Sequence, residues 1–235
     1  MKLGILKTGT PPAGLEHFGS YPAMFEKLLG ESAYDYAVYD VQAGHLPDRP
    51  EACPAYVLTG SANGAYEDLP WIGQLTEFLQ QTRGRAALVG ICFGHQIMAQ
   101  AFGGKVIQSP HGWGQGAHRY DVLQNEPWLG GARTITLPAS HQDQVVELPP
   151  NAEVIAASTF SPFGMLAWRD QRAISLQLHP EFEPDYAMAL AETRRGNGLS
   201  DTEVDRAVAS LREPNDQVRA AGWIRSFLTK ALGEA

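Results

Sequence analysis

Cysteine is scarce in this sequence, which holds only Cys53 and Cys92 among its 235 residues. Two cysteines can form at most one disulfide, and neither stands in a Cys-x-x-Cys pattern. The count argues against a disulfide-stabilised scaffold and favours a reducing, cytoplasmic environment. We interpret Cys53, which only precedes a strand-like run, as an inert thiol.

Long apolar runs and an excess of basic residues are also missing. No segment reaches the roughly 18 consecutive apolar residues that a membrane-spanning helix needs. The first residues lack the apolar core and small-residue cleavage site of a signal peptide. Acidic residues outnumber basic ones, 26 to 18, for a formal net charge of -8. Nucleic-acid and anionic-membrane surfaces need a basic face, so we expect neither as a partner.

The composition itself is that of a globular protein, with 44% hydrophobic and 19% charged residues. Short strand-like runs alternate with helical patterns through the first half of the chain. The predicted strands cover 2–7, 34–40, 55–60 and 86–91, and the predicted helices cover 21–30 and 70–82. This alternation predicts a parallel sheet with helices on both faces.

The second half changes character. Five strand-like segments follow with little helix between them, and we expect them to extend the sheet partly antiparallel: 118–123, 133–137, 152–158, 163–169 and 173–178. From Glu183 the pattern is helical, with a capping box at 200–203. The last amphipathic segment has as candidate core residues Val218, Ile224, Phe227, Leu228 and Leu232. We therefore predict one domain over 1–235, with a helical C-terminal extension at about 183–235.

Cys92 lies in GICFGHQ (90–96), where the apolar run 86–91 ends and a helical pattern begins. A strand-to-helix turn holds a nucleophile on a strained bend, and the small neighbours Gly90 and Gly94 suit such a bend. The helix N-terminus favours a thiolate, and the N–H of Phe93 is placed to donate to an oxyanion. A lone buried cysteine is often only a small core residue. The spacing alone leaves both interpretations open.

His179 is the histidine, among seven, that has a candidate orienting group beside it. In an extended segment, alternate side chains share one side, so Glu181 can contact the imidazole, and Pro180 restricts the backbone between them. Such a carboxylate would fix the tautomer and stabilise the imidazolium. Taken alone, His-Pro-Glu is more often a surface turn. A metal pair lacks a third ligand candidate, so we expect no metal and no cofactor.

Together, GICFGHQ and LHPEF (178–182) resemble the class I glutamine amidotransferases, above all the glutaminase domain of GMP synthase and its stand-alone relatives. The resemblance spans about 2–182. It implies a three-layer α/β/α sandwich around a central, mostly parallel, flavodoxin-like sheet. It also implies Cys92 as nucleophile, His179 as general base and Glu181 as the orienting carboxylate.

Three further segments match this family more loosely. The loop 58–68 resembles the one that supplies a second oxyanion donor, which we assign to Gly60 beside that of Phe93, with Ser61 as a weaker candidate. Segment 103–116 resembles the hairpin after the nucleophile helix, and 139–145 resembles the Ser-His-x-Asp segment. In the latter, Gln142 stands where the synthase domains often carry glycine. The resemblance implies substrate contacts from Gln96, Ser140, His141 and Gln142, with His141 favoured as a pocket-lining residue over a second base.

The expected reaction is hydrolysis of the γ-amide of glutamine or of a γ-glutamyl compound, through a thioester on Cys92. Three alternatives stay open. The chain can feed ammonia to a separate synthase partner, act by itself as a γ-glutamyl peptidase or transferase, or be a non-catalytic regulatory module. We interpret the basic segment 193–198 as a helix end. The helical C-terminus can cover the site or bind a partner. The oligomeric state is not predicted.

Overall fold

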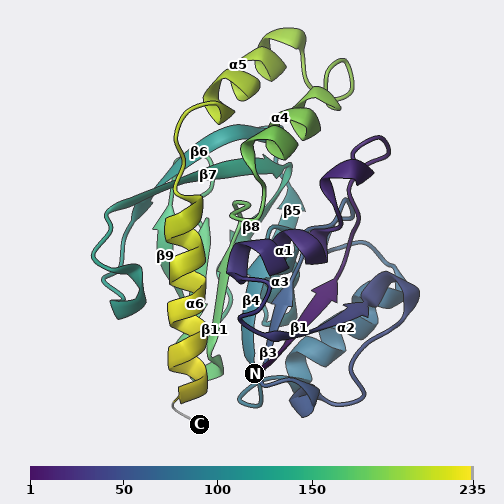
Figure 1. Ribbon diagram of the computed structural model, residues 1–235, viewed down its shortest axis with the longest axis vertical. Helices are drawn as coiled ribbons and strands as arrows, with labels where there is room; N and C mark the ends of the chain where they lie inside the picture. The colour runs from purple at the N-terminus through teal and green to yellow at the C-terminus, as the bar shows by residue number, and fades with distance from the viewer. Residues whose placement is uncertain (234–235) are drawn as a thin grey trace.

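The structure, a computed structural model, describes residues 1–233 (Figure 1). The first half of the chain alternates strands and helices, as its periodicity predicts. Its elements are β1 (Lys2–Lys7), α1 (Tyr21–Leu29), β2 (Asp35–Asp40), β3 (Ala55–Leu58), α2 (Pro70–Gln81), β4 (Ala87–Ile91) and α3 (Phe93–Ala101). No helix in the described part of the chain is long and apolar enough to cross a membrane.

The second half is rich in strands and ends in three helices. The strands are β5 (Lys105–Gln108), β6 (Gly114–Val122), β7 (Thr134–His141), β8 (Asp143–Glu147), β9 (Ala152–Ala157), β10 (Met165–Trp168) and β11 (Ala173–Leu176). The helices are α4 (Pro184–Glu192), α5 (Asp201–Leu211) and α6 (Gln217–Gly233). Both side-chain bonds of the predicted capping box are present between Ser200 and Glu203.

A nine-stranded sheet forms the centre, in the order β2-β1-β3-β4-β11-β10-β9-β6-β7. The strands from β2 to β11 are parallel, and the remaining neighbours pair antiparallel. The predicted mostly parallel sheet with an antiparallel extension is therefore confirmed. The β5–β8 pair forms a separate small sheet, and neither of its strands was predicted from the sequence.

Helices cover both faces of the parallel half, giving the predicted three layers (Figure 1). Helices α1 and α6 pack on one face and α2 and α3 on the other, each pair within its own hydrophobic cluster. Every residue of β4 is buried, as expected for a strand covered on both sides. The layers enclose the parallel strands and leave their carboxyl ends at one edge of the sheet.

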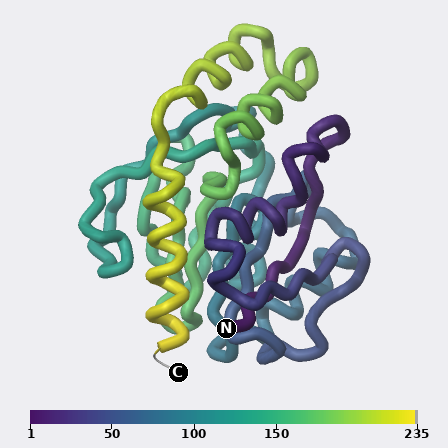
Figure 2. The backbone as a smooth tube through the Cα atoms, in the orientation of Figure 1, coloured from purple at the N-terminus to yellow at the C-terminus, as the bar shows by residue number. Residues whose placement is uncertain are grey.

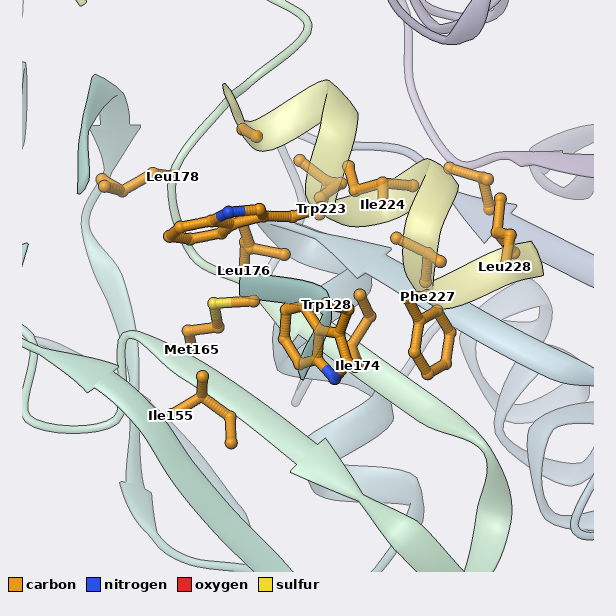
Figure 3. Close-up of a cluster of buried hydrophobic side chains, with 14 of the residues drawn as sticks. Trp128, Ile155, Met165, Ile174, Leu176, Leu178, Trp223, Ile224, Phe227 and Leu228 are labelled. Atoms are coloured by element: carbon orange, nitrogen blue, oxygen red, sulfur yellow. The ribbon is translucent and has the colours of Figure 1, made fainter. Parts of the chain in front are cut away.

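Helix α6 belongs to the main core (Figure 3). Its buried stripe includes Trp223, Ile224, Phe227 and Leu228, which pack with residues of the central strands. The prediction of Val218 as a core residue is wrong, because this side chain is 84% exposed. At 3.6 residues per turn, Val218 falls outside the stripe centred on Ile224 and Phe227.

Helices α4 and α5 lie together over β6 and β7, at one end of the molecule (Figure 2). The loop after β1, purple in Figure 2, rises beside the α4–α5 segment. The same end holds the residues that follow β3, β4 and β11. In open α/β sheets, ligands bind at the carboxyl ends of the parallel strands, so this end is where a site is expected.

Candidate active site

Cys92 occupies the turn between β4 and α3 with φ 53° and ψ -103°, a conformation that a side chain makes unfavourable. The predicted strand-to-helix bend is present, but its strain falls on the cysteine itself. Gly90 and Gly94 serve close packing instead. A Cβ on Gly90 would lie 2.5 Å from the Gly94 carbonyl oxygen, and one on Gly94 would lie 2.7 Å from that of Leu58. The glycines therefore let α3 sit directly on β3 and β4.

His179 and Glu181 form a buried pair, with 2.8 Å between Nδ1 and Oε1. Strand β11 ends earlier than expected, at Leu176, and the chain reaches the pair through a bend and a turn. The contact is as predicted, but it does not come from strand alternation. The backbone N–H of His179 donates to the carbonyl of Pro138 at 2.8 Å, and Phe182 stacks on the imidazole at 3.9 Å between ring centroids. Glu181 thus holds the edge of the imidazole and Phe182 one of its faces, while the bond to Pro138 fixes the backbone of His179.

The charge state of His179 follows from its neighbours. Burial by itself would lower the pKa of His179, but the Glu181 carboxylate and the Cys92 sulfur outweigh it and raise the pKa to about 10. The imidazole is therefore a cation at neutral pH. The cationic imidazole therefore lies beside the Cys92 sulfur at the N-terminus of α3.

Gly60 follows β3 and lies against both His179 and Cys92. A Cβ at this position would lie 3.2 Å from Cε1 of His179 and 3.9 Å from Cβ of Cys92. The hydroxyls of Thr8 and Thr59 donate to the Gly60 carbonyl at 3.1 and 3.2 Å. These bonds fix the Gly60 peptide, and the missing side chain leaves room for the imidazole.

Two cavities meet at Cys92. The first cavity, of about 200 Å³, extends along α3 and the β7–β8 connection, and its lining includes Asn63, Glu67, Gln96, His141, Gln142 and Asp143. The second cavity, of about 500 Å³, extends under α4, and its lining includes Thr10, Pro12, Tyr21, Gly60, His179, Phe182 and Leu190. Ser61, Ser140 and Arg194 line both. His179 faces only the second cavity.

The predicted substrate-binding residues gather around the first cavity. The side-chain amide nitrogen of Gln96 donates to the carbonyl of Asp143 at 3.0 Å and to Gln177 at 3.1 Å. The side-chain oxygen of Gln96 takes part in neither bond. Nδ1 of His141 is 3.1 Å from the carbonyl of Asp143, and burial lowers the pKa of His141 to about 3. His141 is therefore neutral, as befits a lining residue. Ser140 donates to Gln115, and Gln142 lies at the rim, bonded to Gln108.

The model of the class-I glutamine amidotransferase family matches residues 18–189. The chain belongs to this family. It is 28% identical to a glutamine amidotransferase-like protein of Schizosaccharomyces pombe, over 96% of this chain and 98% of the relative. It is 30% identical to gamma-glutamyl peptidase 4 of Arabidopsis thaliana, over 72% of this chain and 70% of the relative.

Solved structures agree on the fold. A glutamine amidotransferase from Thermotoga maritima superposes with a TM-score of 0.78 at 18% identity, covering 99% of this chain and 98% of that one. The class I amidotransferase fold expected from the two motifs is confirmed. Cys92 and His179, 87 residues apart in sequence, converge at one edge of the sheet because they follow the adjacent parallel strands β4 and β11.

Several residues that line the candidate site were not predicted from the sequence, including three charged side chains and one tryptophan. Glu67 and Asp143 add carboxylates to the first cavity, although both lie in segments already matched to the family. Arg194 lines both cavities, and Trp113 lines the first. The only sequence signal for Arg194 was a basic helix end, because its place depends on how α4 and α5 fold over the sheet.

Proposed function

We propose that this chain hydrolyses γ-glutamyl amides through a γ-glutamyl thioester on Cys92. The observation that carries the proposal is the strained Cys92 at the N-terminus of α3, beside the buried pair of His179 and Glu181. A nucleophile, a base within its reach and a group that orients the base are the parts that covalent acyl transfer needs. The family supports C–N hydrolysis as the class of reaction.

In the first half of the reaction, the Cys92 thiolate attacks the γ-carbonyl carbon and forms a C–S bond. The N–H of Phe93, which has no partner within its helix, and the N–H of Gly60 stabilise the oxyanion. The C–N bond then breaks, and the imidazolium of His179 gives its proton to the leaving amine. The γ-glutamyl thioester and a neutral His179 remain.

In the second half, neutral His179 takes a proton from water, and the resulting hydroxide adds to the thioester carbon. The C–S bond breaks and releases glutamate, and the thiolate and imidazolium are restored. Glu181 keeps Nδ1 protonated throughout, so that Nε2 handles the proton that moves.

The two cavities divide the substrate between them. The first cavity holds the γ-glutamyl group, because its carboxylates Glu67 and Asp143 suit the α-ammonium and Gln96 keeps a carbonyl oxygen available as an acceptor. The second cavity holds the leaving amine, because His179, which protonates that amine, lines the second cavity and not the first.

The size of the second cavity favours self-contained cleavage of γ-glutamyl amides over supply of ammonia to a synthase. Ammonia needs about the volume of one water molecule, roughly 30 Å³. The second cavity, of about 500 Å³, exceeds that need many times. The gamma-glutamyl peptidases among the relatives are consistent with a larger leaving group.

Turnover of the purified protein tests the proposal. We expect release of glutamate from γ-glutamyl amides without a partner protein, and a γ-glutamyl adduct on Cys92 visible by mass spectrometry after rapid quenching. The control is Cys92→Ala, which cannot form the thioester. Turnover of glutamine alone, with γ-glutamyl amides untouched, would favour a glutaminase subunit. Neither turnover nor adduct would favour a non-catalytic module.

A further inference from the structure

Arg194 is a cation without an acidic partner at the junction of the two cavities. It follows α4 and lines both cavities next to Cys92, and its Nε is buried without a hydrogen-bond partner. Within residues 1–233 no carboxylate lies at ion-pair distance from its guanidinium. Its neighbour Arg195 is the opposite case, because it pairs with three carboxylates, those of Glu192, Asp201 and Asp205. The acids of this turn therefore neutralise Arg195 and leave Arg194 for another anion.

The guanidinium of Arg194 is held in place by an aromatic face. Its central carbon lies 3.9 Å from the ring centroid of Trp113, a cation–π contact. Gly198, at φ +100°, lies against the same indole, and a Cβ there would come within 3.1 Å of its Nε1. Trp113 and Gly198 thus orient the fork of Arg194 before any ligand binds, which lowers the entropic cost of a bidentate contact.

The charges of the second cavity suit an anion. No Asp or Glu is among its lining residues, and its two cations are Arg194 and the imidazolium of His179. The first cavity carries Glu67 and Asp143. In a chain with a formal net charge of -8, a cavity whose lining holds these two cations and no carboxylate is a local exception. His179 is committed to the proton transfer, so Arg194 is the group available to bind a ligand.

We propose that Arg194 binds a carboxylate on the leaving amine, so that the preferred substrates are γ-glutamyl amino acids or peptides with a free carboxylate. This inference rests on the proposed function and adds the class of leaving group. Arg194 also touches the first cavity, so the γ-glutamyl α-carboxylate is the other source of the same anionic group. Because both groups are carboxylates, only substrates that differ in the leaving amine can show which of the two Arg194 binds.

The test compares three substrates that share the γ-glutamyl group. γ-Glutamylglycine has a carboxylate on the leaving amine, whereas γ-glutamylethylamide and glutamine have none. We expect Arg194→Gln to lower kcat/KM for γ-glutamylglycine about 10- to 100-fold, mainly through KM, as for a lost charge-assisted hydrogen bond. The other two substrates should change less than about 3-fold. Arg194→Lys should restore part of the loss, because it keeps the charge without the fork.

The matched control is Arg212→Gln, which removes one exposed positive charge outside both cavities and should leave all three substrates unchanged. An equal loss on all three substrates would overturn the proposal and assign Arg194 to the γ-glutamyl carboxylate. No loss on any of them would overturn it as well.

Failure of the proposed function would be seen separately, as absence of turnover in the wild-type protein. Binding then tests Arg194 by itself. In the Cys92→Ala background, calorimetry should find γ-glutamylglycine bound about 10-fold or more tightly than γ-glutamylethylamide, and Arg194→Gln should abolish the difference. Equal affinities in the presence of Arg194 would contradict the inference, whatever the chemistry at Cys92.

Discussion

The imidazole of His179 lies parallel to the ring of Phe182, with 3.9 Å between centroids and 6° between planes. Phe182 in turn packs against Tyr21 and Tyr186, with centroid distances of 5.9 and 4.6 Å. Glu181 contacts the edge of the same imidazole. The imidazole is therefore positioned by an aromatic cluster between α1 and α4 as well as by its carboxylate partner, and α4 contributes to the candidate site through this packing.

The pH dependence of stability should report the pair of His179 and Glu181. The pKa of His179 is raised to about 10, above its unfolded value of about 6.5. Its contribution to stability is therefore fully present below pH 6.5 or so and is lost as the pH rises towards about 10. Glu181→Gln removes the carboxylate that raises this pKa. Between about pH 6.5 and 10, denaturant titrations should give a smaller loss of unfolding free energy for the variant than for the wild type.

The same variant should lose roughly 10²- to 10⁴-fold in kcat, because the tautomer and the imidazolium are no longer stabilised. For the stability measurements, the control is wild-type protein unfolded at the same pH, because the two proteins share all other titrating groups. Parallel pH profiles of stability for the two proteins would contradict the assigned charge state of His179.

Strain at Cys92 predicts that function and stability oppose each other at this residue. Glycine accepts φ 53° and ψ -103° without a side-chain clash, whereas alanine does not. Relief of such strain stabilises the folded state by about 1–3 kcal/mol, and the larger conformational entropy of glycine in the unfolded chain offsets part of this gain. We expect Cys92→Gly to unfold at a higher denaturant concentration than Cys92→Ala, by about 1 kcal/mol, with both variants inactive. A less stable glycine variant would mean that the bend is not strained.

The lack of a side chain at Gly60 should matter for turnover and little for folding. A Cβ there would press on Cε1 of His179 at 3.2 Å, and the φ of Gly60 is not in the left-handed region. We expect Gly60→Ala to lower kcat about 10-fold or more by displacing the imidazole, with correct folding retained by circular dichroism. The matched control is Gly73→Ala in α2, where a Cβ meets nothing within 4 Å. It should keep full activity and stabilise the helix by about 0.5–1 kcal/mol. Equal activity of both variants would contradict the proposed geometry.

Helix α6 should stabilise the whole described unit. Trp223 is buried, its Nε1 donates to the carbonyl of Leu129 at 3.0 Å, and its ring meets that of Trp128 edge to face. We propose that residues 1–233 form one cooperative domain, so Trp223→Ala should destabilise all of it by about 3–5 kcal/mol. Exposed Val218→Ala should change stability by less than about 0.5 kcal/mol. A separate, earlier unfolding transition of α6 in Trp223→Ala would contradict the single domain.

The features that could be predicted from the sequence are those set by local patterns of apolar and small residues. Strands β1 to β4 and helices α1 to α3 follow from hydrophobic periodicity. The turn at Cys92 was predicted at the right place, although its flanking glycines serve close packing and not the bend itself. Val218 was wrong because an apolar residue on the opposite side of α6 was added to a stripe that was otherwise predicted correctly, as the buried Ile224 and Phe227 show. The small β5–β8 sheet was missed because its strands are short and their pairing is not local. Arg194 was missed for a similar reason, since no pattern near residue 194 indicates that α4 will end over Cys92.

The opposite charges of the two cavities have a consequence for the direction in which a substrate binds. A γ-glutamyl dipeptide carries an α-ammonium and an α-carboxylate at its γ-glutamyl end and a single carboxylate at the other end. In the proposed binding mode, reversal would bring the single carboxylate against Glu67 and Asp143, and like charges disfavour that contact. We therefore expect the site to select the direction in which the substrate binds. An isomer whose scissile bond is the same but whose terminal charges are exchanged should bind poorly.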